Sequence, residues 1–156
     1  MAAASKRFFR LAKGVEVAAF TVTKVQALDA LYLLAKDTPV DRAKARSNWR
    51  ISVGRPLSGI IAPYRPFSSR HRPPYTGGGS KGERSNLNAV VAAGTARLSR
   101  YTTGSIYILN NVPYIGPLDR GHSPQTTSGF VARSVFASIA RTAPKIKPIF
   151  EKEFKK

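Results

Sequence analysis

The sequence predicts a single α+β domain with a long N-terminal helix, a small antiparallel sheet, two further helices and a long basic loop. Three observations lead to this class. Apolar residues near the N-terminus recur at helical spacing, two short segments alternate at strand spacing, and prolines and glycines separate the segments. With 156 residues, 42% of them hydrophobic, the chain fits one domain (1–156) that can bury a core.

The first helix is predicted from an apolar stripe that runs from Val15 to Lys36 at steps of three and four residues. Pro39 ends this helix, because a proline disfavours helical geometry in the residue before it. Residues 1–14 are basic and free of acids, a composition also found in organellar transit peptides. We interpret them as a basic arm that leads into the helix. The stripe consists of Val15, Ala18, Val22, Val25, Leu28, Tyr32 and Ala35.

Two strands are predicted from period-two patterns and β-branched composition. In "WRISVG" the apolar residues Trp49, Ile51 and Val53 alternate with polar ones, as in a half-buried strand. The second strand covers 105–111, "SIYILNN", which is rich in β-branched and aromatic residues.

A long loop is predicted over 54–85, where five prolines and a run of three glycines exclude a long helix. "LSGII" (57–61) is expected to form a short strand at its start. Loops of this length are functional or flexible, and cations with interleaved aromatics can bind phosphates and bases, although a solvated loop explains the same composition. The candidate polyanion or partner contacts are Arg55, Arg65, Arg70, Arg72, Lys81 and Arg84.

Two more helices complete the prediction. Ser85 or Asn86 is expected to cap "LNAVVAAGTARLS". A last helix is expected in "GFVARSVFASIART", with Pro144 as its end and residues 143–156 as a basic C-terminal tail. The expected buried face of the last helix consists of Phe130, Val131, Val135, Phe136 and Ile139.

The charge balance is far from ordinary: 26 Lys and Arg face 8 Asp and Glu, for a net charge of +18. Such a surplus repels itself and attracts polyanions or acidic protein surfaces. The absence of cysteine excludes disulfides, thiolate metal sites and cysteine nucleophiles. No apolar run is expected to reach the roughly 20 residues that cross a bilayer, so no membrane partner is expected.

Asp119, His122 and Ser123 have the residue types of a hydrolytic triad. Triads, however, draw their members from distant parts of a chain, and the nucleophile elbow G-x-S-x-G is absent. We therefore interpret this stretch as a structural corner between strand and helix, with Asp119 capping a turn. The only other histidine is His71, and neither histidine has a second metal ligand at suitable spacing. We expect no enzyme activity, no cofactor and no metal.

Two blocks resemble the tailed-bacteriophage neck or tail-completion proteins, the family that includes the lambda-type minor tail protein Z. In "TPVDRAKARSNWRISVG" a Pro-Val-Asp turn, an arginine and Asn-Trp before a strand match the family. Arg42 and Ala43 stand where the family has Thr and Gly, so this turn is expected to differ. The matching residues are Pro39, Val40, Asp41, Arg46, Asn48 and Trp49.

The second block is "IYILNNVPYIGPLDRGHSPQTTSGFV", which resembles the family's Asn-Asn-x-Pro-Tyr, a later acid, Gly, Ser and Gln, and a Gly before the last helix. The two blocks lie in the family's order between residues 15 and 140, with 54–85 the least comparable part. The matching residues are Ile108, Asn110, Asn111, Pro113, Tyr114, Leu118, Asp119, Gly121, Ser123, Gln125 and Gly129.

The resemblance implies a virion component that assembles in the host cytoplasm and joins a DNA-filled head to a tail. Copies of the chain would form a ring, six-fold or twelve-fold, around the DNA channel. The expected partners are a head-side connector or stopper, a tail-side terminator or tube protein and the genomic DNA in the channel. We expect Trp49 and Tyr114 to anchor the fold and its assembly. The alternative is a small basic nucleic-acid-binding protein, ribosomal-like or related to DNA packaging.

Overall fold

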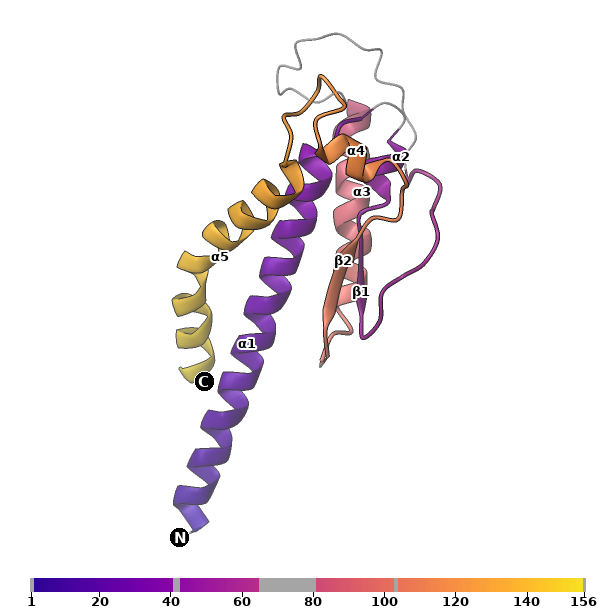
Figure 1. Cartoon of the computed structure of the whole chain (residues 1–156). Coiled ribbons are helices and arrows are strands. Elements are labelled where there is room, and N and C mark those ends of the chain that lie inside the picture. The colour runs from indigo at the N-terminus through magenta and orange to yellow at the C-terminus, as the bar shows by residue number, and fades with distance from the viewer. Residues whose placement is uncertain (1, 41–42, 65–80, 103, 156) are drawn as a thin grey trace.

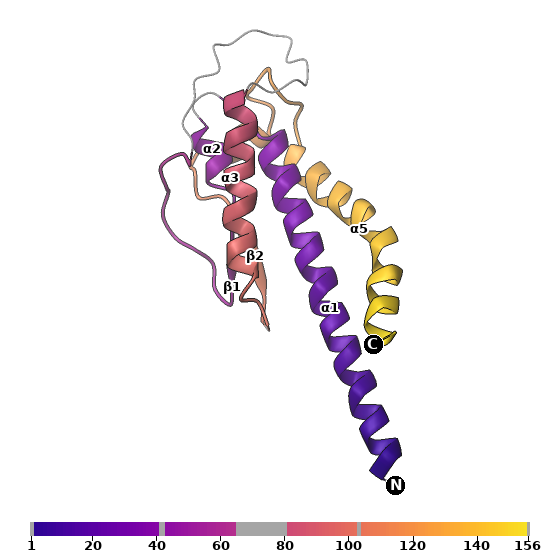
Figure 2. The ribbon, with the colours of Figure 1, turned by 180° about the vertical axis from the view of Figure 1, so that it is seen from behind.

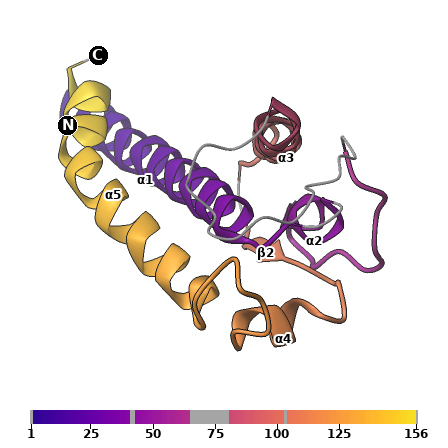
Figure 3. The ribbon, with the colours of Figure 1, turned by 90° about the horizontal axis from the view of Figure 1, so that it is seen from above.

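The computed structural model describes residues 2–40, 43–64, 81–102 and 104–155. Helix α1 forms the long axis; α5 packs along one side of it, and α3 with the two-stranded sheet lies on the other (Figures 1 and 2). Viewed from above, the short helices α2 and α4 lie at one end of α1 (Figure 3). The predicted α+β class is confirmed. The elements are α1 (Ala2–Asp37), α2 (Lys44–Ser47), β1 (Arg50–Val53), α3 (Lys81–Leu98), β2 (Ile106–Leu109), α4 (Ile115–Asp119) and α5 (Phe130–Phe154).

Helix α1 has 36 residues, so it is longer than the predicted helix. It absorbs the residues from Ala2 onward that were expected to form a separate arm. No proline interrupts this stretch, and its alanines and long basic side chains favour a helix. The helix ends at Asp37, before Pro39, as predicted, and the Thr38 hydroxyl donates to the Leu34 carbonyl at 2.6 Å.

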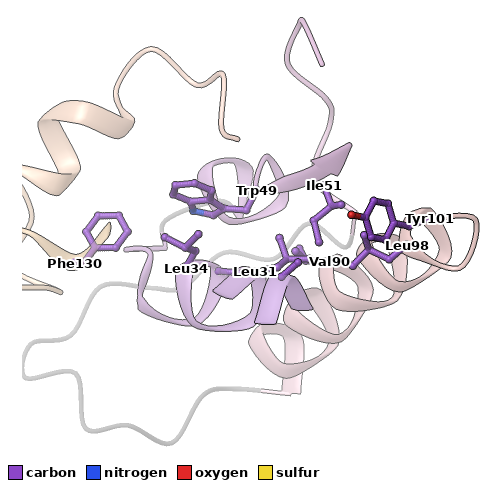
Figure 4. Packing of buried hydrophobic residues seen from close by; sticks show 10 residues of the cluster. Leu31, Leu34, Trp49, Ile51, Val90, Leu98, Tyr101 and Phe130 are labelled. Atoms are coloured by element: carbon purple, nitrogen blue, oxygen red, sulfur yellow. The ribbon is translucent and has the colours of Figure 1, made fainter. Parts of the chain in front are cut away.

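The core lies where the C-terminal half of α1 meets α3, the sheet and the start of α5. Figure 4 shows the buried side chains in a row from Phe130 at one end to Tyr101 at the other. Gly94 lets α3 approach closely, because a Cβ there would overlap Leu31 Cδ2. The cluster consists of Ala27, Leu31, Leu34, Ala35, Trp49, Ile51, Val90, Leu98, Tyr101 and Phe130.

Strands β1 and β2 pair antiparallel, with Arg50 opposite Leu109 and Val53 opposite Ile106. Ser52 is buried as well as Ile51, so both faces of β1 are covered and the predicted half-buried alternation is wrong at this position. The strand expected at 57–61 does not form. These residues are held by side-chain hydrogen bonds instead of a ladder.

Two helix boundaries differ from the prediction. Helix α3 begins at Lys81, so the loop ends before Ser85. Helix α5 continues through Pro144 and Pro148 to Phe154, and the segment 143–154 is helical rather than an irregular tail. A proline removes one backbone donor but keeps a helical φ, and both prolines are exposed, where water can reach the freed carbonyls. The helix bends along its length (Figure 1), as proline-containing helices do.

The buried face of α5 is small and polar rather than apolar. Apart from Phe130, the residues turned toward α1 are Ser134, Ser138 and Thr142 at four-residue steps. Ser134 Oγ donates to Asp37 Oδ2 at 2.9 Å, which joins the two helices at this point. The predicted core residues Val135, Phe136 and Ile139 are exposed, because they lie on the side of α5 turned away from α1.

The hydrogen bond between Thr38, just after α1, and Trp49, just before β1, predicts a local stability effect. The Thr38 hydroxyl accepts from Trp49 Nε1 at 2.7 Å inside the core. Thr38→Val leaves the buried indole donor without an acceptor and should lower the free energy of unfolding by about 1–3 kcal/mol. Urea denaturation followed by fluorescence of the single tryptophan measures this loss. The control is Thr23→Val, which removes a similar bond to Ala19 on the exposed side of α1. Equal denaturation midpoints in both variants would contradict the assignment.

Candidate interaction site

The first family-like block holds the start of the long loop against the domain. Asn48 is fully buried; its Nδ2 donates to the carbonyls of Lys44 and Ile61 at 2.8 and 3.0 Å, and its Oδ1 accepts from Ile61 N at 2.9 Å. The neighbouring Ser47 Oγ accepts from Tyr64 N at 3.2 Å. One amide side chain thus closes both hydrogen bonds of a backbone unit that no strand pairs with.

The second block adds two more amide side chains to the same region. Asn110 Nδ2 donates to the Ala45 carbonyl of α2 at 2.8 Å. Asn111 Nδ2 donates to the carbonyls of Leu57 and Gly59 at 2.9 and 3.1 Å. These two asparagines belong to the Asn-Asn-x-Pro-Tyr motif of the second block. The fold brings them next to Asn48 because β2 pairs with β1.

The corner that follows uses its polar groups for backbone contacts. Asp119 Oδ1 accepts from Val131 N at 2.8 Å in the first turn of α5, where a carboxylate stabilises the helix end. Ser123 Oγ accepts from Gln125 N at 3.2 Å, and His122 is exposed. The carboxylate and the hydroxyl of the triad-like set are therefore engaged with main-chain donors rather than with His122.

A groove of about 420 Å³ lies between this corner and the end of α1. Gln125 connects its two sides, since its Oε1 accepts from Val40 N at 2.7 Å and its Nε2 donates to the Val40 carbonyl at 3.1 Å. Tyr114 lines the groove and is 42% exposed, whereas Trp49 is buried in the core. Of the two expected anchors, Trp49 therefore packs inside the domain, and Tyr114 lies at the surface beside the groove.

Three positions where the resembled family has glycine adopt positive φ. Gly121 and Gly129 have φ of 90° and 74°, and Gly129 directly precedes α5. Ala43 has φ 60°, a left-handed conformation that a Cβ makes unfavourable by roughly 1–2 kcal/mol. The chain thus keeps at Ala43 a backbone that suits glycine.

The structure describes three of the six predicted cationic contacts, one in the loop after β1 and two at the start of α3. Arg55 is exposed just after β1, and Arg84 is exposed in the first turns of α3. Lys81 is the first residue of α3. Arg65, Arg70 and Arg72 lie outside the described residues. His71 also lies outside them, and in the described part of the chain no three His, Asp or Glu side chains gather as a metal site requires.

Most of the exposed large apolar side chains among the described residues lie on α5 and on the N-terminal half of α1. Of these, the sequence analysis assigned Val135, Phe136 and Ile139 to the core. Amphipathic spacing identifies the apolar face of a helix, but it does not show whether the surface that covers this face belongs to the same chain or to another one. The exposed side chains on the two helices are Phe8, Phe9, Leu11, Val15 and Val17 on α1, and Val135, Phe136, Ile139, Ile146 and Phe154 on α5.

One described helix is long and apolar enough to cross a membrane, the part of α1 from Ser5 to Asp37. By length and composition, this corrects the expectation that no segment reaches a bilayer's thickness. The core helix of a soluble protein passes the same test, and 33% of the apolar window in α1 is buried inside the domain.

The amide contacts of Asn48 predict that one side chain controls the order of 54–64. In Asn48→Ala the hydrogen exchange of the Ile61 amide should rise about five- to tenfold, because its acceptor is lost. Exchange of the Leu31 amide in α1 reports global unfolding and should change less. Asn88→Ala, at an exposed position of α3, is the matched control. If the Ile61 and Leu31 amides accelerate equally, the effect is global, and the proposed local role of Asn48 is wrong.

The left-handed residue Ala43 predicts an unusual response to glycine. In Ala43→Gly the relief of backbone strain offsets the lost methyl burial and the added freedom of the unfolded chain, so stability should change by less than about 0.5 kcal/mol. Ala45→Gly in α2 gains no such relief and should lose about 1 kcal/mol or more. Thermal denaturation of both variants measures the difference, and equal losses would contradict strain at Ala43.

No protein-family model, curated protein or solved structure matches this chain, so its functional assignment rests on the residue patterns and geometry described above.

Proposed function

We propose that this chain is a structural, non-enzymatic subunit of a tailed-phage neck, acting in head–tail connection or tail completion. In this role, copies of the chain form a ring around the DNA channel of the virion. The ring joins a head-side connector or stopper to a tail-side terminator or tube protein.

The observation that carries the proposal is the backbone conformation at the three family-glycine positions. Ala43, Gly121 and Gly129 all have φ between 60° and 90°. Few residues other than glycine adopt such angles, so the family pattern and the backbone agree at three separate places. This agreement favours a shared fold over chance sequence similarity. It holds even at position 43, where alanine replaces the glycine of the family.

The polar residues of the two family-like blocks also favour a framework role. Asn48, Asn110, Asn111, Asp119 and Gln125 each hydrogen-bond to main-chain groups. Side chains engaged in this way position loops and helix ends, whereas a reaction centre needs a nucleophile and a base that reach each other. The polar residues that match the family pattern therefore hold loops and helix ends in place.

The surface composition is that of a subunit completed by neighbours. Phe8, Phe9 and Phe136 are each about 70% exposed, and apolar exposure of this kind marks interaction sites. Exposed cations occur on several elements, among them α1, α3 and α5, rather than on one patch. We favour acidic rims of adjoining rings as their partners, because a strongly cationic lumen would hold DNA and slow its exit.

The net charge of +18 favours one rival, a small nucleic-acid-binding protein. Such a protein would bind duplex DNA or RNA tightly as a monomer, with an affinity that falls steeply as salt increases. A neck subunit would self-associate without nucleic acid.

Electron microscopy of the purified protein tests the proposal. We expect symmetric rings with an open bore in the absence of DNA, and rings of the same size when DNA is added. Sedimentation at low and high salt should show assembly that persists at high salt, since screening reduces repulsion between these basic chains. Rings that form only with DNA would overturn the preference for acidic protein rims. A salt-sensitive monomer bound to nucleic acid would overturn the neck assignment.

A further inference from the structure

Helices α1 and α5 leave bare two apolar stripes with the same residue spacing. On α1, Phe8, Leu11 and Val15 follow one another at steps of three and four residues and are 69%, 49% and 48% exposed. On α5 the exposed stripe has the same steps. Repeats of this kind form the contact line between two packed helices. The α5 stripe consists of Phe136, Ile139, Ala143 and Ile146.

The bare α1 stripe continues the face with which α1 holds its own α5. Ala18 and Val22 extend the same steps and lie, by helix geometry, on the side of α1 that carries Asp29. Asp29 Oδ1 pairs with Arg141 Nη2 of α5 at 3.1 Å, so this side faces α5. The stripe is therefore one helix-binding surface, covered within the chain only over its C-terminal part.

The covered part ends where α5 ends. A Cβ placed on Gly14 would lie 3.3 Å from Phe154 Cε1, so the last turn of α5 rests against this glycine. Figure 1 shows α1 continuing beyond the C-terminal end of α5. A groove of about 300 Å³ opens at this point, with Leu11, Val17 and Phe154 as its apolar walls.

A second copy of the chain carries the side chains that fit this surface. Phe136 is 71% exposed, more than any other large apolar side chain among the described residues, and it begins the bare stripe of α5. The α5 stripe from Phe136 to Ile146 is about 15 Å long and the α1 stripe from Phe8 to Val15 about 11 Å, so one can cover the other. The exposed cation Lys6 lies on another side of α1, whereas Arg10 and Lys13 line the groove together with Glu153. A cation at the edge of a groove can lie against an aromatic ring such as that of Phe136.

We propose that the outer face of α5 in one copy packs on the N-terminal stretch of α1 in the next copy, with Phe136 entering the groove beside Leu11. This inference deepens the proposed neck function and rests on it for self-association. The two surfaces differ, so the contact is head-to-tail and can repeat from copy to copy until a ring closes.

Paired substitutions on α1 and α5 test the contact. Phe8→Asp and Phe136→Asp should each weaken self-association about 10- to 100-fold, because the proposed contact buries both phenylalanine side chains between copies and each substitution replaces one of them by a charge. The controls Thr23→Asp and Ala137→Asp add the same charge at exposed positions of α1 and α5 that lie off the stripes, and they should change affinity less than about threefold. Sedimentation velocity over a dilution series measures the affinities, with circular dichroism to verify folding. Equal effects of each variant and its control would overturn the contact.

Cross-linking identifies the two surfaces directly, since the chain has no cysteine. A Leu11→Cys chain mixed with a longer-tagged Ile139→Cys chain should give mixed dimers with a short bis-maleimide, and Thr95→Cys on the exposed side of α3 should not. Assembly without the mixed 11–139 product would overturn this contact and leave the neck proposal standing. A chain that stays monomeric at every concentration would overturn both. Monomers that float with phosphatidylglycerol vesicles through α1 would assign the stripe to lipid and overturn the contact.

Discussion

The C-terminal half of α1 is the constraint on which the rest of the structure depends. Between Ala27 and Ala35 this helix is buried on both sides, by α3 and the sheet on one and by α5 on the other. A two-stranded sheet is only marginally stable by itself, so β1 and β2 depend on packing against this helix and α3. The loops of the corner in turn depend on the sheet, because Asn110 and Asn111 follow directly from β2. Loss of α1 packing therefore removes the candidate site together with the core.

Outside the sheet and the helices, side-chain amides supply the hydrogen bonds that backbone groups would otherwise make with a neighbouring strand. The residues after β1 run as irregular chain, and their backbone groups bond to Asn48, Arg50 and Asn111. Gln125 does the same for Val40 across the groove. This use of amides gives the Asn and Gln residues of the family-like blocks a structural role. It also gives an irregular surface a fixed shape, which a subunit needs if neighbours are to recognise it.

The two faces of α5 differ in composition, and the proposed contact uses the outer one. Ser134, Ser138 and Thr142 are small enough for α5 to approach α1 closely, and Asp37 and Asp29 add polar links to Ser134 and Arg141. The larger apolar side chains are left for the outside, where they raise the free energy of the isolated chain in water. A strong positive charge opposes crowding of identical chains, so apolar contact and acidic companions must together offset this repulsion in an assembly.

The sequence alone determined the α+β class, the end of α1 before Pro39, the two strands and the structural nature of the corner at Asp119. These features depend on local chemistry: a proline that breaks a helix, a period of two, a carboxylate near a helix start. Tertiary structure decided what local patterns leave open. The sequence predicts the amphipathic pattern of α5, but which face is buried depends on the surface of α1. In the folded chain, Phe130, Ser134 and Ser138 face α1. Pro144 did not end α5, because an exposed helix tolerates a missing donor. The partners of Asn48 and Asn110 are far away along the chain, so only the folded structure brings them together.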